Sequence, residues 1–492
     1  YSASWLNSAQ TTIHSDTRTG EILNASILIN ANMISVQYAD RIGATVAIDP
    51  RVRTTVFPQE IQGELIQAAI AQAVGTGLGL TMNWGASCAY PVDSLRSASF
   101  TQKYGLASSV MGGVIINDVA TEEDVRNGVC LVNAKPGPYD ELVIKYLYQP
   151  IYASSLQEEK ETLDSWIREH TGDPYYAYIR NQSRFDSDPR NSRGSLGDDH
   201  LKSFDYMLPN VRKGFENYYS WFAKEDRDFL MRRRVHSALS ERLSGRIYAI
   251  LSYIGGIYLN DIREKDAIPS YSMVDREKQK AALSKALELA KNLDWVDDTA
   301  HLNEFEISDK KADRLRLDIF NGIFGRLPYV EVCTERFPGA AYTASEYLDD
   351  IYGIVWEGVL KHRPLENFER ALQTAFLESI ISTSTATAPI GSFKASKTGF
   401  AATGKPEINL AALRNGGKVD MKMYSLQNAE EVAGFSSIPP IYTNQTKIAA
   451  YYFDLLMRTK DMLKKAISTA PEADRSHYDL LIYRINKATE IE

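Results

Sequence analysis

The chain has 492 residues, of which 44% are hydrophobic and 24% are charged, and this composition excludes disorder as the main state. The 63 acidic and 55 basic residues give a formal charge of −8, which argues against a nucleic-acid binder because such proteins need a basic face. No apolar run approaches the ~20 residues that span a bilayer. At about 150 residues per domain, the length allows two or three domains.

The first third of the chain is predicted to combine a β-rich start with one long helix. Residues 1–55 are predicted to be rich in β-structure, with a turn at 16–20 and a strand over 21–29. Residues 59–80 predict a helix because apolar side chains recur every four residues. Residues 84–135 predict loops with short apolar pieces.

Helical patterns dominate after Pro136. Residues 171–198 are polar and predict a surface loop or a linker, and 386–443 show little helical period. The two terminal helices are expected to form a hairpin. The predicted helical stretches are 139–170, 199–222, 224–260, 275–293, 309–326, 344–385, 444–468 and 471–489.

The end of the predicted helix at 59–80 can be aligned with a zinc-peptidase motif. In His-Glu-x-x-His, the two histidines share one helix face and bind zinc, and the glutamate is the general base. The extended form adds a turn glycine and a third histidine. Laid over this sequence, the motif places Gln72, Ala73, Thr76 and Met82 at the His, Glu, His and His positions, and only the turn glycine, Gly79, is kept.

The substituted residues are poor replacements for the zinc chemistry. A glutamine amide is a weak ligand, alanine has no donor atom, threonine offers a weak neutral oxygen, and a thioether prefers softer metals. Without a ligated metal, no water is brought near a neutral pKa. We therefore predict no catalytic residues, no metal and no cofactor at this site.

The chain resembles a family of large, exported bacterial zinc-dependent metalloproteases with a metzincin-like catalytic domain. The resemblance runs in order along nearly the whole chain, and it includes a Met-turn at Met111. The matching pieces are Asp16–Ile22, Asp49-Pro50-Arg51, the degenerate helix with Gly75, Leu78, Gly79, Leu80 and Asn83, Tyr90–Arg96, Tyr139-Asp140, Asp188-Pro189-Arg190, Leu196–Asp199, Gly255–Asn260 and Ser345–Asp350.

The resemblance implies an α+β fold, with a degenerate metzincin-like zincin lobe followed by a mostly α-helical C-terminal region. We expect the lobe at 1–135, a helical region wrapping it at 136–385, and an irregular segment with a terminal helical hairpin at 386–492. The family has a long upstream part. Because the chain starts at Tyr1 and shows no signal peptide, we expect a processed product whose upstream segment stays associated as a separate chain.

The resemblance and the lost donor set together predict a pseudoprotease, a non-catalytic homologue that binds a peptide or protein. It would be an accessory subunit of a cell-envelope assembly at the cell surface, the outer membrane or the periplasm of a Gram-negative bacterium. Two alternatives are an active zinc-dependent endopeptidase with an unrecognised metal site, and an extracellular glycan or nutrient-binding protein. The first needs bound metal and the second needs exposed aromatic side chains.

Candidate binding residues come from two places. A strand beginning near Glu21 is expected to offer an edge to an extended peptide. The aromatic cluster of Tyr175, Tyr176 and Tyr178 stands in a polar loop, where aromatic side chains often mark contact patches.

The spacing of the histidines and cysteines does not indicate a second metal or catalytic site. No two of the seven histidines lie within five residues of each other, so no helix presents a histidine pair. Asp198 and Asp199 beside His200 are interpreted as a helix N-cap and first turn, with a ligand cluster as the alternative. Cys88 is expected to be buried and inert, and whether it is bonded to Cys130 stays open.

Overall fold

The computed structural model of the chain describes residues 9–29, 33–179, 187–191, 195–260, 262, 266, 268–301, 310–383 and 445–489. Within these residues the fold is α+β, as predicted, with many helices and two separate two-stranded sheets. The sheets are the antiparallel hairpins β1–β2 and β3–β4, so sheet structure contributes little to the core.

The first hairpin lies beside the helix that carries the degenerate motif. β1 (Gln10–Ser15) pairs with β2 (Ile22–Leu28), which confirms the strand predicted over 21–29. The turn between them is closed by Arg18, whose guanidinium Nη2 lies 2.8 Å from the Asp16 carboxylate. The hydroxyl of Thr11 donates to the carbonyl of Ala73 at 2.9 Å, which fixes the hairpin to α2 (Gln59–Gly77).

The prediction that residues 1–55 are β-rich is wrong for their second half. Residues Met33–Thr45 form helix α1, and Ile42 and Val46 lie four apart in the core. Gly43 allows α1 to approach α8 (Leu230–Leu251) closely, because a Cβ at that position would lie 2.5 Å from the carbonyl oxygen of Ala238. Tertiary packing against a later helix therefore decides the conformation here.

The residues between α2 and Pro136 form short elements, as predicted. Each of these elements is at most seven residues long, so none presents an extended apolar face. These elements are η2 (Trp84–Cys88), η3 (Val92–Arg96), α3 (Ala98–Tyr104), η4 (Val110–Gly112) and α4 (Glu122–Arg126).

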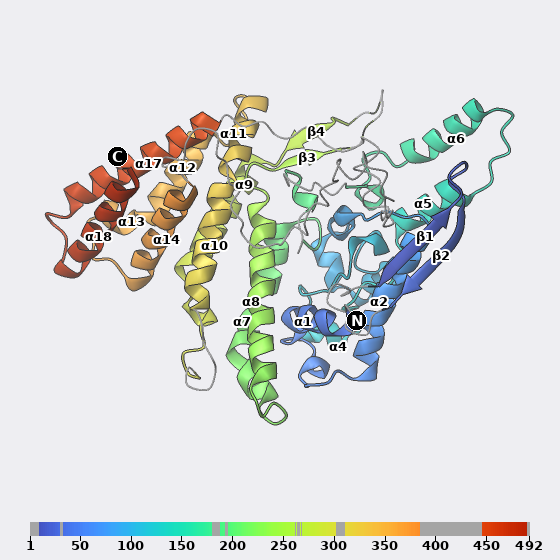
Figure 1. Cartoon of the computed structure of the whole chain (residues 1–492), viewed down its shortest axis with the longest axis horizontal. Helices are drawn as coiled ribbons and strands as arrows, with labels where there is room; N and C mark the ends of the chain where they lie inside the picture. Colours follow the sequence, from blue (N-terminus) through green and yellow to red (C-terminus); the bar gives the residue numbers. More distant parts are fainter. Residues whose placement is uncertain are drawn as a thin grey trace, which may run out of the picture.

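The later helices follow one another away from the lobe, from α7 and α8 to α17 and α18 at the opposite end of the molecule (Figure 1). The terminal hairpin predicted at 444–489 is present as α17 and α18. The bounds are α5 (Pro138–Tyr148), α6 (Leu156–Arg168), α7 (His200–Phe222), β3 (Ile257–Leu259), β4 (Tyr271–Met273), α9 (Arg276–Lys291), α10 (Lys311–Gly325), α11 (Leu327–Arg336), α12 (Ala344–Val355), α13 (Glu357–Leu360), α14 (Asn367–Thr383), α17 (Gln445–Ala466) and α18 (Glu472–Thr489).

Four helix predictions need correction. The stretch 139–170 is divided into α5 and α6, which residues 149–155 separate. The stretch 344–385 is divided into α12, α13 and α14. The first break falls at Trp356, and the second falls where His362 has a positive φ of 52° and Pro364 follows it. Helix α11 lies outside every predicted stretch and begins with Pro328 in its first turn. Residues 257–259, predicted as the end of a helix, form strand β3 after Gly255, which has a φ of 62°.

One continuous hydrophobic core runs from α1 and α2 through α7 and α8 to α18. The lobe has its own smaller clusters, one of them around Tyr90 and Leu95. Helices α3 to α6 contribute no side chain to the first core, and none of the described helices is long and apolar enough to span a bilayer. The three-part division at residues 135 and 385 stays a prediction.

A buried ion triad joins the lobe to α8. Asp118 accepts hydrogen bonds from Arg242 Nε at 2.6 Å and Arg246 Nε at 2.8 Å, and its side chain is 1% exposed. Burial alone would raise the pKa of Asp118, but the two guanidinium groups outweigh that effect and lower it. The carboxylate is therefore ionised and holds the segment around Asp118 against α8.

We predict that Asp118→Ala lowers the free energy of unfolding by on the order of 3–5 kcal/mol, because it leaves two guanidinium groups with an uncompensated buried charge. The matched control is Asp349→Ala, since the Asp349–Arg458 pair is half exposed and is expected to contribute no more than about 1 kcal/mol. Urea denaturation of both variants measures the difference. Equal losses in the two variants would contradict this role of the triad.

Candidate functional site

Helix α2 rests on the turn that carries Met111. A Cβ at Gly75 would lie 2.7 Å from Met111 Sδ, so the missing side chain of the glycine makes room for the thioether. Met111 is fully buried, and its carbonyl accepts a hydrogen bond from the Asn83 N–H at 3.0 Å. The turn is therefore held beneath both the helix and the segment that follows it.

The first and third ligand positions of the motif meet in space. Gly79, with a φ of 88°, reverses the chain after α2 and brings Met82 back toward the helix. The Gln72 amide Nε2 lies 3.1 Å from Met82 Sδ. The first and third ligand positions of the motif are thus adjacent, and their two side chains bond to each other.

The remaining two positions are also occupied by uncharged groups. The Thr76 hydroxyl donates to the carbonyl of Gln72, one turn earlier, at 3.2 Å. Ala73 is buried and offers only a methyl group where the family has its general base. The four positions therefore carry no formal charge and no strong base.

This donor set does not fit zinc. Protein zinc sites use imidazole, thiolate or carboxylate ligands, and none of the four positions provides one. The Gln72 amide presents its N–H to the thioether, and the Thr76 hydroxyl is engaged by backbone. No metal-dependent step follows from these residues.

Asp140, at the start of α5, fixes the Met111 turn. Its carboxylate accepts from the Ser109 hydroxyl at 2.5 Å and from the N–H groups of Val110 and Gly137, both at 2.9 Å. Burial raises the pKa of Asp140, and these hydrogen bonds act against that rise. Sequence reasoning gave Asp140 no role, although an acid two residues after Pro138 is a recognisable first-turn position.

Asn83 joins the site to a segment about 95 residues further along the chain. Its side chain donates to the carbonyl of Ala177 at 2.9 Å and accepts from the N–H of Ile179 at 3.1 Å. Gly85 allows this approach, because a Cβ there would lie 2.2 Å from Ile179. The tyrosines of this segment are therefore neighbours of the degenerate motif, which no sequence spacing indicated.

The structure places the four candidate binding residues in different surroundings. Glu21 is exposed at the start of β2, and the three tyrosine rings are half-buried. Tyr175 packs edge-on against Tyr90, Tyr176 stacks on His170, and Tyr178 stacks on Tyr139. The rings are thus packed against the protein, and a binding role for any of the four stays a prediction.

Of the two acids beside His200, Asp199 is the N-cap of α7 and Asp198 bonds to another segment. Asp199 accepts from the N–H groups of Leu201 and Lys202, which confirms the N-cap interpretation. Asp198 accepts from the N–H of Val92 at 3.1 Å. Across the part of the chain that the structure describes, no three His, Cys, Asp or Glu side chains are grouped to hold a metal ion.

His200 itself is a buried neutral histidine. Its Nε2 is 2.9 Å from the carbonyl of Pro189, and its ring stacks on Tyr253. Burial lowers the pKa of His200 from 6.5 to about 4. Its position is that of a structural side chain at the beginning of α7.

We predict that stability falls as the pH falls from about 6.5 to about 4, because the unfolded state then binds a proton that the folded His200 does not. His200→Gln keeps a donor for the Pro189 carbonyl and cannot titrate. It should reduce the pH dependence of the unfolding free energy by up to about 1.4 kcal/mol per pH unit. Chemical denaturation from pH 7 to pH 4 measures this, with exposed His14→Gln as the control. An unchanged slope in His200→Gln would contradict it.

The three cysteines are free. Cys88 is buried, as expected, and lies 3.2 Å from the Ser195 hydroxyl. Burial raises the pKa of the Cys88 thiol, which keeps it protonated and poorly nucleophilic. The question of a Cys88–Cys130 bond is answered, since each has a free thiol.

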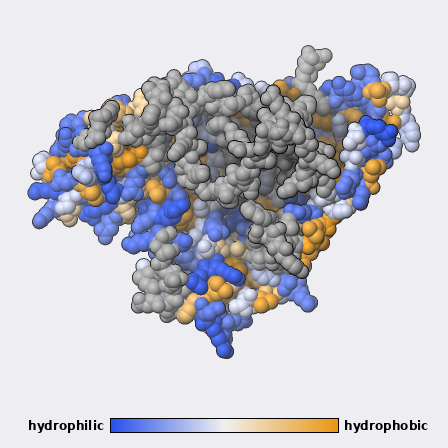
Figure 2. Space-filling model, in the orientation of Figure 1, coloured by the Kyte–Doolittle hydropathy of each residue, from blue (hydrophilic) through white to orange (hydrophobic). Residues whose placement is uncertain are grey.

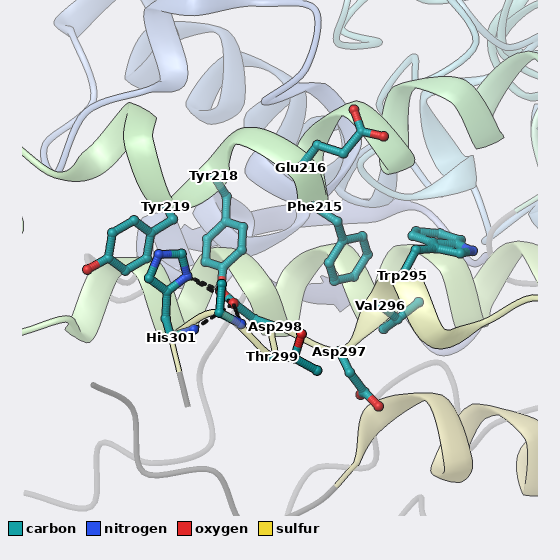
Figure 3. A pocket seen from close by; sticks show the side chains of 11 residues that line it. Phe215, Glu216, Tyr218, Tyr219, Trp295, Val296, Asp297, Asp298, Thr299 and His301 are labelled. Atoms are coloured by element: carbon teal, nitrogen blue, oxygen red, sulfur yellow. Dashed lines mark hydrogen bonds and ion pairs between the residues drawn. The ribbon is translucent and has the colours of Figure 1, made fainter. Parts of the chain in front are cut away.

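Another polar cluster lies at the C-terminal part of α7, around a cavity of about 210 Å³ (Figure 3). Asp298 accepts from the hydroxyl of Tyr218 and from His301 Nδ1, the latter at 2.9 Å. The His301 ring stacks on Tyr219, with centroids 3.4 Å apart. Burial would raise the pKa of Asp298, but the hydrogen bonds from Tyr218 and His301 lower it. The cluster fastens the loop after η7 (Asp294–Val296) to α7.

Comparison with models of protein families gives a match to a family described as Met-zincin over residues 54–363, well over half of the chain. The matched residues include α2, the Met111 turn and α7 to α12. No curated protein and no solved structure matches the chain.

Proposed function

The chain belongs to the Met-zincin family, and from that premise we propose that it is a non-catalytic member which uses the peptidase scaffold to bind a peptide or protein. It contains a metallopeptidase-related domain. The proposal adds that this domain has lost hydrolysis and kept recognition. In this proposal the protein is exported and is an accessory subunit of an envelope assembly in a Gram-negative bacterium, as the family resemblance suggests.

The proposal rests on one observation. The turn and the glycine contacts of the zinc-peptidase motif are present, but the side chains at its ligand positions cannot bind zinc. The Met111 turn, the close contact at Gly75 and the reversal at Gly79 are all present. At the three ligand positions, the Gln72 amide donates to the Met82 thioether, and the Thr76 hydroxyl donates to the Gln72 carbonyl. The four positions offer no donor set for a metal that would lower the pKa of a bound water, and no carboxylate that would accept its proton.

A binding role is supported by the hairpin next to the motif. Within the described residues, β2 pairs only with β1, so its other edge presents backbone groups that an extended chain can use. Most of β2 is exposed, from Leu23 to Leu28. Recognition by backbone pairing needs no metal, and it therefore survives the loss of the zinc ligands.

We expect protein purified without added metal or an affinity tag to contain far less than about one zinc ion per chain. We also expect it to leave a mixed fluorogenic peptide library uncleaved, with and without added zinc. Elemental mass spectrometry and a fluorescence assay measure the two quantities.

The proposal is contradicted by stoichiometric zinc that survives dialysis together with peptide cleavage that a chelator abolishes. That pair of results would favour an active endopeptidase whose metal site uses other residues. A matched control is Ala73→Gly, which removes no donor atom. It is expected to leave the zinc content and the absence of peptide cleavage unchanged.

A further inference from the structure

Exposed apolar side chains gather beside the end of α2. Eleven of the twenty-one large hydrophobic side chains that are exposed among the described residues belong to three short segments, 23–29, 74–78 and 146–156. Figure 2 shows hydrophobic surface among hydrophilic surface on the side of the molecule where Figure 1 places the first hairpin, α2, α5 and α6. Such a concentration marks an interaction site, since scattered apolar residues would not cluster in this way.

The three segments meet at Gly79. A Cβ at that glycine would lie 3.5 Å from Ile22 and 3.7 Å from Leu147, so the hairpin and α5 both reach the end of α2. The Tyr148 hydroxyl donates to the carbonyl of Leu78 at 2.8 Å. We define the junction surface by its six exposed apolar residues, which are Leu23, Ile27, Val74, Leu78, Leu147 and Tyr148.

Helix α6 lies beside the junction surface and gives it a negatively charged flank. The Lys145 ammonium of α5 lies 4.4 Å from the centre of the Trp166 ring, which holds α6 against α5. None of the thirteen residues of α6, all of them described, is buried. Residues 156–169 contain five acidic and two basic side chains, so this flank has a net negative charge.

We infer that the junction surface binds a basic amphipathic segment of a partner protein. Apolar side chains of that segment would cover Leu78 and Leu147, and its lysines or arginines would face the acids of α6. The charge of α6 argues against a second copy of the chain, because two such flanks would repel each other. The inference rests on the proposed binding role, and it names the partner chemistry.

The test uses the full-length chain and a fluorescein-labelled synthetic peptide of about 18 residues, built from leucine and lysine with helical periodicity. We expect this peptide to bind at least about tenfold more tightly than a leucine–glutamate peptide or a lysine–serine peptide of equal length. Fluorescence anisotropy measures the three affinities. The affinity for the leucine–lysine peptide should fall as the salt concentration rises.

Two variants locate the binding. Leu78→Ser with Leu147→Ser, and separately Glu161→Lys with Glu169→Lys, should each weaken binding by about tenfold or more. The matched control is Leu480→Ser with Tyr483→Ser, which removes apolar residues of similar exposure from α18 at the other end of the molecule. Unchanged circular dichroism spectra verify that all variants are folded.

Equal effects of the three double variants would overturn the inference, because they would show unspecific attraction to an acidic protein. So would weak binding of all three peptides, or self-association in sedimentation that the Leu78→Ser and Leu147→Ser variant abolishes. The last result would identify a second copy as the occupant. None of these outcomes alters the zinc content, so failure here is distinguishable from failure of the proposed function.

Discussion

The close contact between Gly75 of α2 and the thioether of Met111 is the constraint on which the rest of the site depends. A Cβ at position 75 would lie only 2.7 Å from the sulfur, so the glycine lets α2 and the turn pack this closely without displacing the Met111 side chain. Asp140 holds the turn from below, and Asn83 holds the chain after Gly79. The positions of Gln72, Thr76 and Met82 follow from these contacts.

The residues that shape the site are different from the residues at its ligand positions. The contacts that shape the site are made by glycines, backbone groups and the buried Asp140, none of which is a ligand position. The ligand positions are filled by neutral side chains that bond to each other or to backbone. A scaffold that is stabilised without its metal can lose the ligands and still fold, in contrast to small domains whose folding depends on zinc.

The parts of the fold that the sequence predicted are those determined by local pattern. The helix at 59–77 has apolar residues every fourth position, and the hairpin has a turn motif at Asp16–Gly20. Helix α1 was missed because its conformation depends on packing against α8, about 200 residues away. The break between α13 and α14 coincides with a positive φ at His362, which hydrophobic periodicity does not indicate.

The sequence indicated the motif positions of the candidate site, but it did not indicate which distant residues pack against them. The motif alignment assigned Gln72 and Met82 to the first and third ligand positions, and the structure places their side chains 3.1 Å apart. The approach of Tyr178 and Ile179 is made through Asn83 and Gly85, whose roles are visible only once both segments are folded. The packing of Tyr175 against Tyr90 likewise joins residues with no sequence relation.

The most direct measurement of the central claim is a zinc titration of the variant in which Gln72→His, Ala73→Glu, Thr76→His and Met82→His are combined. If the frame is intact and only the donor atoms are lost, isothermal titration calorimetry should show about one zinc ion bound per chain, where the parent protein binds none with comparable affinity. A folded variant that still fails to bind zinc would contradict the claim that this helix and turn keep the geometry of a zincin site.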